Sequence, residues 1–455
     1  MVVGELAEAA DLLVIGGGPG GYVAALRAAQ LGREVTLVER AGAAGLGGTC
    51  LHVGCIPSKA LIELANTAYR MRELEAAGLD ADGVRVSLER FQAWRAELCG
   101  SLARGVGDLL ARAGVRVVEG LARFNRPDRV AVHTPEDRVL FFEFEHAIVA
   151  TGSRARPVPA DALDSTAAVA LTAVPSTLAV LGADYIGLEL ATAFAKLGAR
   201  VTVVEPGERV LPEVEASLVK PVLRRLRRLG VGVRVGTGIE GVEAHCVVAS
   251  LGRVPNTDDL GLEAAGIAVG DDGLLAVGPD LLAAPRIAAI GDVVAGPASA
   301  HKAMAQGVVA AEVLSGEPAA FDAQAIPIVV FTDPEIASVG LTEEQAREAG
   351  LEPVVATFPL AASGRASTLG ARDGFTKLVA DAATDRVIGV HAVGPHATEL
   401  VAGGALAIEL MAAPGDVAAT IHPHPTLSEG LHEAAALLLG QPIHVAAERA
   451  AAPQP

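Results

Sequence analysis

One pattern occurs twice in the chain, and it constrains the fold more than any other feature. In residues 11–39 a buried-strand pattern leads into a glycine-rich loop, an alanine-rich helical run follows, and a second strand ends in a glutamate. Residues 178–205 repeat this plan, with the same number of positions between the first loop glycine and the final glutamate. A strand, a helix and a second strand joined in this way form a dinucleotide-binding unit, whose helix N-terminus receives the phosphates. The sequence therefore predicts an α/β protein with two Rossmann-like domains.

The first glycine loop has the complete fingerprint of such a unit. Gly16 permits the tight turn, Gly18 lets the backbone approach a pyrophosphate, and Gly21 lets the helix pack closely on the strand. Glu39, at the end of the second strand, is placed to accept a hydrogen bond from a ribose hydroxyl. A lone Gly-x-Gly-x-x-Gly run is often a plain turn, but here the strand, the helix and the terminal acid agree. We therefore predict that this unit binds a dinucleotide.

The second glycine loop departs from the fingerprint at one position. Gly182, Gly187 and the terminal Glu205 are present, but Asp184 stands at the middle glycine position. A carboxylate there brings bulk and negative charge to the place where a pyrophosphate should approach the backbone. Two interpretations stay open. Either Asp184 turns to solvent and the nucleotide binds weakly, or this unit has partly lost its binding function.

Two cysteines lie close together just after the first unit, in the run 47–59, GGTCLHVGCIPSK. Four residues separate Cys50 from Cys55, which is not the usual spacing of zinc ligands, and no second ligand pair follows. We predict a redox disulfide, with a structural disulfide as the alternative. A helix N-terminus and a nearby cation, such as Lys59, would stabilise the thiolate of the reduced pair. Beside a flavin, such a dithiol can move two electrons between a nicotinamide and a disulfide.

The overall charge and hydropathy exclude several classes of protein. A net charge of -18 argues against nucleic acid as a partner. The first residues, Met1–Glu5, carry no basic segment of a secretory signal. The mostly apolar stretch 167–183 is short and interrupted, so we expect no membrane span. The cytoplasm is therefore the expected compartment.

Several ordered segments resemble one family. The run 47–59 is similar to the redox-active motif of the dihydrolipoamide dehydrogenase family, within the flavin-dependent pyridine nucleotide–disulfide oxidoreductases. The resemblance extends over roughly residues 10–440 through the second flavin motif at 290–292, the flavin-proximal segment at 300–303, and the dimerisation-domain segments at 331–335 and 422–429.

This resemblance implies FAD on the first unit, NAD on the second, and a C-terminal α+β dimerisation domain. It implies an FAD-binding domain with the redox disulfide over 1–153, a shortened NAD-binding domain over 154–260, a central segment completing the FAD site over 261–325, and the dimerisation domain over 326–455. Beyond the loop glycines and the two glutamates, the cofactor-binding residues that it implies are Gly48, Thr49, Lys59, Thr151, Gly152, Ser153, Tyr185, Gly252, Asp292 and Ala300.

The resemblance also implies the catalytic groups of the C-terminal domain. His424 is the base that removes a proton from the thiol substrate, and Glu429 orients its ring. By the same resemblance the base comes from the second subunit of a homodimer. His422 is the closest competitor for the role of base.

The roles of the remaining catalytic groups follow from the order of the family motif. The substrate thiolate attacks Cys50, whereas Cys55 lies nearer to the flavin. Lys59 and Glu189 match a pair that lies beneath the flavin N5, where hydride arrives. These assignments are expectations from the resemblance alone.

Three features separate the members of the family. The IPSK sequence at 56–59 resembles the lipoamide type more than the glutathione type. There is no cysteine pair near the C-terminus, which argues against a mercuric-ion reductase. Glu205 favours NAD over NADP. We therefore hypothesise NAD-dependent oxidation of dihydrolipoamide. The resemblance implies, in addition, that the substrate is carried on the lipoyl domain of a 2-oxoacid dehydrogenase complex and that the E2 subunit of this complex is a candidate partner. The alternatives are another disulfide reductase, such as glutathione reductase, and a non-catalytic flavoprotein with an assembly or binding role.

Overall fold

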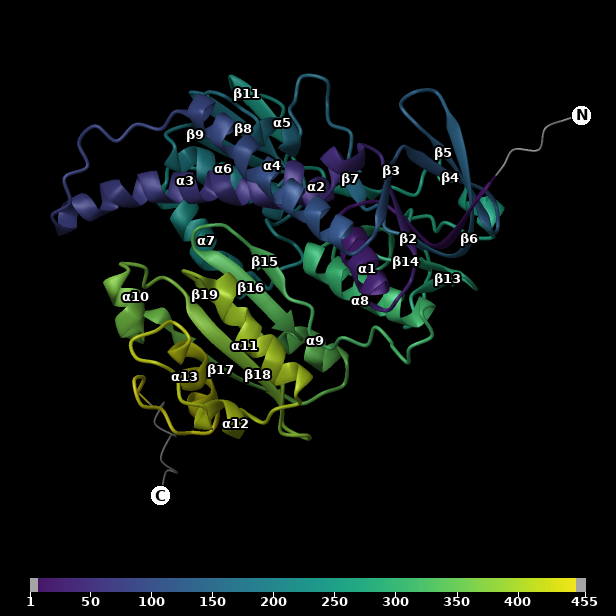
Figure 1. The fold of residues 1–455 in the computed structure, drawn as a ribbon. Helices are drawn as coiled ribbons and strands as arrows, with labels where there is room; N and C mark the ends of the chain where they lie inside the picture. Colours follow the sequence, from purple (N-terminus) through teal and green to yellow (C-terminus); the bar gives the residue numbers. More distant parts are fainter. Residues whose placement is uncertain (1–6, 447–455) are drawn as a thin grey trace, which may run out of the picture. The chain divides into compact units, whose positions relative to one another are not determined.

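The computed structural model describes residues 7–446 of the chain (Figure 1). Within it the chain forms two compact units, each made of two separate stretches of sequence. The first unit runs to Val174 and resumes over Ala249–Asp322, and the second comprises Pro175–Val248 and the residues from Ala323 onward. Residues 1–5, on which the expectation of no secretory signal rests, lie outside the described part of the chain.

An eight-stranded sheet forms the centre of the first unit, in the order β13-β14-β6-β1-β2-β3, with β5 paired to β6 and β4 paired to β5. Its strands are β1 (Glu8–Ile15), β2 (Val35–Glu39), β3 (Arg116–Glu119), β4 (Leu121–Arg126), β5 (Arg129–His133), β6 (Val139–Val149), β13 (Leu282–Ala284) and β14 (Ile287–Ala289). β1 pairs in parallel with β2 and β6, which confirms the first predicted strand–helix–strand unit. The strands β4, β5 and β6 form an antiparallel excursion, whereas β3 is a parallel edge strand beside β2.

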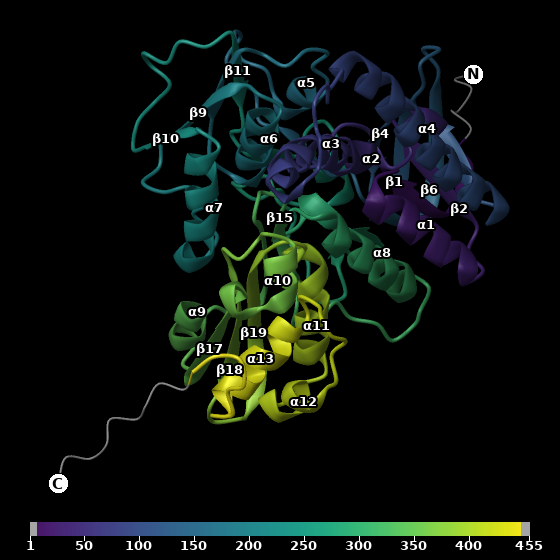
Figure 2. The same cartoon turned by 90° about the vertical axis from the view of Figure 1, so that its left-hand side faces the viewer.

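The first unit also contains helices, two of which carry the cysteine pair. They are α1 (Pro19–Gln30), α2 (Gly48–His52), α3 (Cys55–Glu73), α4 (Leu88–Arg112), α5 (Ser165–Val169) and α8 (Ala300–Leu314), with the short 3-10 turns η1 (Gly42–Gly45), η2 (Leu74–Ala77), η3 (Leu262–Ala265) and η4 (Gly291–Val293). α1 and α8 lie side by side (Figures 1 and 2), and a Cβ at Gly307 of α8 would come within 2.5 Å of the Gly20 carbonyl oxygen of α1. Small residues therefore allow the close packing of these helices.

Both faces of the central sheet are buried, as parallel sheets require. Along β1, Leu12 belongs to the core on the α1 side, and its neighbour Leu13 belongs to the core shared with the β4–β5 hairpin. Both side chains have an exposed fraction of 0%. The sheet thus holds the C-terminal ends of β1 and β6 rigidly at one edge, where the first glycine loop begins.

The second unit contains two sheets. The first is four-stranded, in the order β10-β9-β8-β11, and carries the second predicted strand–helix–strand unit. Its elements are β8 (Thr177–Leu181), α6 (Tyr185–Lys196), β9 (Arg200–Glu205), α7 (Ala216–Arg228), β10 (Gly232–Val235) and β11 (Cys246–Ala249). The structure forms no strand in the short connection between β10 and β11.

The other sheet of this unit is five-stranded and antiparallel, in the order β15-β16-β19-β18-β17. Its strands are β15 (Ile328–Val330), β16 (Glu335–Gly340), β17 (Pro353–Pro359), β18 (Phe375–Asp381) and β19 (Arg386–Gly394). Its helices are α9 (Glu343–Glu348), α10 (Gly364–Thr368), α11 (Ala397–Glu409), α12 (Pro414–Ala419) and α13 (Glu429–Leu438), with the 3-10 turn η5 (Leu360–Ala362). This arrangement confirms the predicted C-terminal α+β fold.

A buried ion cluster joins the two sheets of the second unit. The Asp333 carboxylate, before β16, accepts hydrogen bonds from Lys196 of α6 at 2.6 Å and from Arg225 of α7 at 2.8 Å. The Lys196 side chain is only 4% exposed. Removing one partner of such a cluster leaves a buried charge without compensation.

Asp333→Asn is therefore expected to destabilise the protein by about 2–4 kcal/mol in urea unfolding at neutral pH. Burial raises the pKa of Asp333, but Lys196 and Arg225 more than offset it, so the net pKa lies below its ordinary value. The contribution is therefore present above the pKa of an unfolded aspartate and is lost as the pH falls through the lowered folded value.

The pair between Arg224 and Asp373 provides the control for this prediction, because its carboxylate is about as exposed as that of Asp333, at 28% against 32%, whereas its cation is far more exposed than Lys196. The Arg224 side chain is 48% exposed, so Asp373→Asn should cost less than about 1 kcal/mol. Equal losses in the two variants would contradict a special role for the buried cluster.

Over the described residues, no helix combines the length and the apolar character needed to cross a membrane.

Candidate active site

The first glycine loop has the geometry of a phosphate cradle. Gly16 adopts a φ of +104°, and a Cβ there would lie 2.4 Å from the Ala150 carbonyl oxygen. A Cβ at Gly21 would lie 1.9 Å from the Gly16 carbonyl oxygen, so both positions require glycine. At Gly18, the N-cap of α1, a Cβ would meet no atom within 4 Å, and no side chain caps the helix. The residues present therefore fit a pyrophosphate at this N-terminus.

Glu39 lies across the same loop. Its Oε2 accepts a hydrogen bond of 2.7 Å from the Gly17 amide. The carboxylate is thereby fixed beside the phosphate cradle, at the end of the second strand, where a ribose would bind. Its role as a ribose ligand stays a prediction.

The cysteine segment packs directly on this loop. The Gly47 amide donates to the Gly17 carbonyl at 2.9 Å, and a Cβ at Gly48 would lie 2.8 Å from the Gly18 Cα. Cys50 lies in α2, and Cys55 is the first residue of α3. The two cysteines are thiols in the structure, and their side chains are hydrogen-bonded to each other. The predicted dithiol is therefore brought together beside the phosphate cradle.

The surroundings of the two cysteines indicate which of them keeps its proton when the pair is reduced. The hydrogen bond to Cys55 raises the pKa of Cys50, burial raises it further, and Lys59 opposes the rise. Cys55, in contrast, lies at the N-terminus of a 19-residue helix, where a negative charge is stabilised. We therefore expect Cys50 to keep its proton and the first thiolate to form on Cys55.

A second cluster of predicted cofactor residues gathers in the first unit. The Ser153 hydroxyl donates to Asp292 at 2.5 Å, and the Thr151 hydroxyl donates to the Asn256 carbonyl at 2.7 Å. The strands β7 (Ser153–Ala155) and β12 (Arg253–Pro255) pair here and place Gly152 and Gly252 in the same cluster.

Sequence reasoning missed two polar residues of this cluster. Arg253 donates from Nε to the Ser153 hydroxyl at 2.7 Å, and Asn256 donates from its amide to the Thr151 carbonyl at 2.9 Å. Arg253 and Asn256 lie one and four positions after Gly252, a predicted cofactor-binding residue, and this closeness in sequence could have indicated them.

The region around α8 holds two further unpredicted residues. Lys302 is buried and donates to the Ala295 carbonyl at 2.9 Å, and burial lowers its pKa. The Gly291 amide donates to Gln306 at 2.8 Å. Ala300, a predicted cofactor residue, is the first residue of this helix.

The predicted histidine–carboxylate pair is formed in the second unit. His424 Nδ1 lies 2.8 Å from Glu429 Oε1, and the Thr426 amide donates to Glu429 Oε2 at 2.7 Å. Burial raises the pKa of Glu429, but the Thr426 and His424 hydrogen bonds more than offset it, so the net pKa is lowered. A charged carboxylate that accepts from Nδ1 leaves Nε2 as the basic nitrogen. The His424 side chain is 76% exposed, so that nitrogen is accessible in the isolated chain.

His422 has a different environment. Its ring centroid lies 6.0 Å from that of His432. Burial and His432 lower its pKa. The geometry therefore favours His424 over His422 as the oriented base.

The second glycine loop repeats the contacts of the first one except at Asp184. The Ala183 amide donates to Glu205 at 2.7 Å, and a Cβ at Gly187 would lie 2.2 Å from the Gly182 carbonyl oxygen. Nucleotide binding at this loop stays a prediction, but the structure shows where the Asp184 side chain lies. Its Oδ1 accepts a hydrogen bond of 2.8 Å from the Gly187 amide and caps α6, because aspartate is among the best N-cap residues.

Two predicted residues near this loop differ in exposure. Tyr185 is 38% exposed at the start of α6. Glu189 is buried and accepts a hydrogen bond of 2.9 Å from the Phe331 amide. Lys59 belongs to the first unit and Glu189 to the second, and their pairing stays a prediction.

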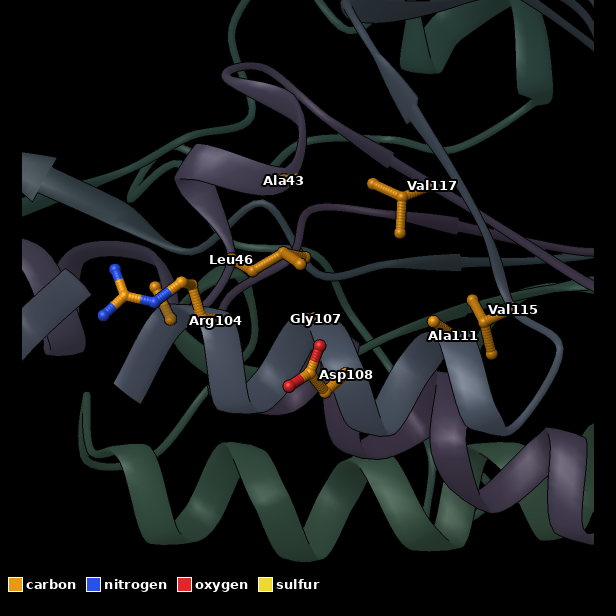
Figure 3. A pocket seen from close by; sticks show the side chains of 9 residues that line it. Ala43, Leu46, Arg104, Gly107, Asp108, Ala111, Val115 and Val117 are labelled. Atoms are coloured by element: carbon orange, nitrogen blue, oxygen red, sulfur yellow. The ribbon is translucent and has the colours of Figure 1, made fainter. Parts of the chain in front are cut away.

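A hollow of about 530 Å³ lies elsewhere in the first unit, beside α4 and η1 (Figure 3). Small apolar side chains line most of it, with Arg104 and Asp108 at its rim. None of the predicted catalytic or cofactor residues lines it. We therefore do not assign this hollow to the redox site.

Comparison with known proteins agrees with this geometry. Residues 10–307 match the family described as pyridine nucleotide-disulphide oxidoreductase, and residues 326–435 match the dimerisation domain of the same family. The chain belongs to the pyridine nucleotide-disulphide oxidoreductases. Its cofactors are FAD and NAD, and the dimerisation domain supports a homodimer.

Individual relatives cover almost the whole chain. Dihydrolipoyl dehydrogenase 2 of Haloarcula marismortui is 46% identical over 475 residues, which cover 98% of this chain and 100% of that protein. The dihydrolipoyl dehydrogenase of Geobacillus stearothermophilus is 43% identical, with coverage of 98% and 99%. Among solved structures, LpdA of Mycobacterium tuberculosis is 28% identical, with a TM-score of 0.87 and coverage of 94% of this chain and 99% of that one.

The same comparison bears on the length of the chain. The alignment with the Haloarcula protein is longer, at 475 residues, than the 455 residues of this chain. The chain therefore has deletions relative to that protein, in keeping with the short connection between β10 and β11.

Proposed function

We propose that this protein is a dihydrolipoamide dehydrogenase, which oxidises dihydrolipoamide to lipoamide and reduces NAD. The observation that carries the proposal is the hydrogen-bonded pair of Cys50, in α2, and Cys55, at the start of α3, in a segment that packs on the first glycine loop. The His424–Glu429 pair supplies the base that such a reaction requires. The near full-length similarity to dihydrolipoyl dehydrogenases supports the same substrate.

The dithiol chemistry follows from these groups. With Cys50 and Cys55 oxidised to a disulfide, the partner subunit's His424 removes a proton from one thiol of dihydrolipoamide. The resulting thiolate attacks the Cys50 sulfur and displaces Cys55 as a thiolate, which the N-terminus of α3 stabilises. The second substrate thiol then attacks the mixed disulfide and releases cyclic lipoamide.

The protons and electrons balance in this sequence. Cys50 leaves as a thiol and holds one substrate proton, the second proton passes through the base to solvent, and the enzyme dithiol holds the two electrons. Gly16, Gly18 and Gly21 would hold FAD at the first glycine loop, where its chemistry would be the transfer of this electron pair from the dithiol to NAD as hydride.

The wider assignments belong to the same proposal. The lipoyl domain of a 2-oxoacid dehydrogenase complex is the proposed substrate carrier, its E2 subunit the proposed partner, and the cytoplasm the proposed compartment. The proposed domains are those expected from the sequence, with residues 1–153 and 261–325 forming the FAD domain, 154–260 the NAD domain and 326–455 the dimerisation domain. The proposed pairing of Lys59 with Glu189 beneath the flavin belongs here as well.

A steady-state assay of the purified protein tests the substrate. We expect turnover of dihydrolipoamide with NAD to exceed turnover of glutathione disulfide with NADPH by at least about a hundredfold in kcat/KM. A preference for glutathione disulfide and NADPH would identify another disulfide reductase and refute the proposal.

A further inference from the structure

The two glycine loops of this chain form a matched pair that differs at one side chain. Gly18 and Asp184 are the N-caps of α1 and α6, and their backbones are nearly identical, with φ and ψ of −68° and −178° at Gly18 and −71° and 179° at Asp184. In each loop, a glutamate at the end of the second strand accepts a hydrogen bond of 2.7 Å from the residue after the first glycine. The backbone of the second loop is therefore suited to the same chemical group as the first, the pyrophosphate of a dinucleotide.

The side chain of Asp184 changes what that backbone can offer. In the first loop, the space in front of Gly18 is open. In the second loop, the Asp184 carboxylate accepts the Gly187 amide at 2.8 Å, which is one of the N–H groups that a helix N-terminus presents to a phosphate. The carboxylate also brings a negative charge to the position where a dianionic pyrophosphate would lie. It is held there by the cap hydrogen bond, so it does not leave the site without cost.

We propose that the Asp184 side chain occupies the pyrophosphate position of the pyridine-nucleotide loop and sets the affinity of this protein for NAD. The nucleotide must displace an internal cap before its phosphates reach the helix N-terminus. This inference rests on the proposed function only in taking the second loop as the NAD site. It identifies a residue of this chain that determines nucleotide affinity, separately from the dithiol chemistry.

Two variants of Asp184 separate the cap from the charge. Asp184→Asn keeps a side-chain oxygen that can cap α6, since asparagine is as good an N-cap as aspartate, and removes only the charge. Asp184→Gly removes both and restores the arrangement found at Gly18. We expect the Kd for NAD, measured by isothermal titration of the FAD-loaded protein, to fall at least about tenfold in Asp184→Gly and by a smaller factor in Asp184→Asn.

Another capping aspartate of the chain provides the matched control. Asp164 caps α5 by accepting the Ala167 amide at 2.8 Å, with a backbone φ of −76° and ψ of 175°. This helix does not follow a glycine loop. Asp164→Asn and Asp164→Gly should therefore leave the Kd for NAD unchanged, and only Asp164→Gly, which loses the side-chain cap, should lower the thermal midpoint.

Ligand fragments localise the effect to the phosphates. ADP-ribose, which retains the pyrophosphate, should bind more tightly to Asp184→Gly by the same factor as NAD. Adenosine, which has no phosphate, should bind equally to all variants. Unchanged or weaker binding of NAD and ADP-ribose by Asp184→Gly would overturn the inference, and so would an equal gain with adenosine.

Failure of this inference can be distinguished from failure of the proposed function. Reduction of the bound flavin by dihydrolipoamide, with no nucleotide present, depends on the cysteine pair and not on the second loop. If that reduction proceeds while the Asp184 variants bind NAD like the parent protein, only the inference fails.

Discussion

Cys50→Ser is expected to lower the turnover of dihydrolipoamide by at least about a thousandfold, while the protein folds and retains FAD. The substitution removes the sulfur that the substrate thiolate attacks, and a hydroxyl cannot form the mixed disulfide. The phosphate cradle at Gly16, Gly18 and Gly21 does not depend on this sulfur, so the flavin should copurify at the parent stoichiometry. Turnover in the standard NAD assay and the flavin-to-protein absorbance ratio measure the two effects.

Cys246, which lies outside the proposed redox site, provides a control for this result. Cys246 is half-buried in β11, and burial raises the pKa of its thiol, so it is not activated as a nucleophile. Cys246→Ser should therefore retain turnover within about twofold of the parent protein. If Cys50→Ser kept parent turnover, the dithiol mechanism would be wrong even with FAD bound.

His424→Gln is expected to lower kcat by about 10²–10⁴-fold with little change in stability, because the substrate thiol would lose its proton acceptor. Glu429→Gln should cause a smaller loss, since it weakens the orientation and charge stabilisation of the ring but keeps the imidazole. The lowered pKa of Glu429 keeps its carboxylate charged above the ordinary carboxylate range, and the pair is lost only as the pH falls through the lowered value.

A second histidine–carboxylate pair of similar geometry serves as the control. His444 Nδ1 lies 2.6 Å from Glu433 Oε1, and Glu433 is buried, with an exposed fraction of 5%. His444→Gln disturbs an ion pair of the same kind without touching the proposed base, so it should affect unfolding more than kcat. Equal losses of kcat in His444→Gln and His424→Gln would contradict the assignment of His424.

Much of the site could be predicted because its determinants are local in sequence. The loop positions Gly16, Gly18 and Gly21 lie within one short segment, and so do Cys50 and Cys55, so their spacing alone predicted that the members of each set lie close together. The partners His424 and Glu429 are likewise only five positions apart in the sequence. For such groups, the local backbone conformation decides the geometry.

The parts that the sequence did not predict depend on contacts between distant segments. Nothing in the sequence pattern near Lys196 indicates Asp333 as its partner, because the two residues meet only when α6 and the turn before β16 pack together. The hydrogen bond from Arg253 to Ser153 has the same origin. Side chains whose partners are chosen by tertiary packing cannot be paired from periodicity.

The position of Asp184 illustrates a different limit. The fingerprint identified it as a departure whose bulk and charge oppose a pyrophosphate, and the sequence left open whether the carboxylate turns to solvent or the unit has partly lost its function. The structure instead uses it as the N-cap of α6. An aspartate directly before a helix is also a strong N-cap, and this preference, which the fingerprint does not consider, decides where the Asp184 side chain lies.

An anaerobic titration of the FAD-loaded protein with dihydrolipoamide, followed by visible absorbance, tests the central claim most directly. The account predicts that a long-wavelength thiolate–flavin band grows to completion with about one equivalent of substrate, because the Cys50–Cys55 disulfide accepts two electrons. Addition of NAD should then discharge the band. A flavin that dithionite reduces but dihydrolipoamide leaves unchanged would contradict the account, because the dithiol would then not connect this substrate to the flavin.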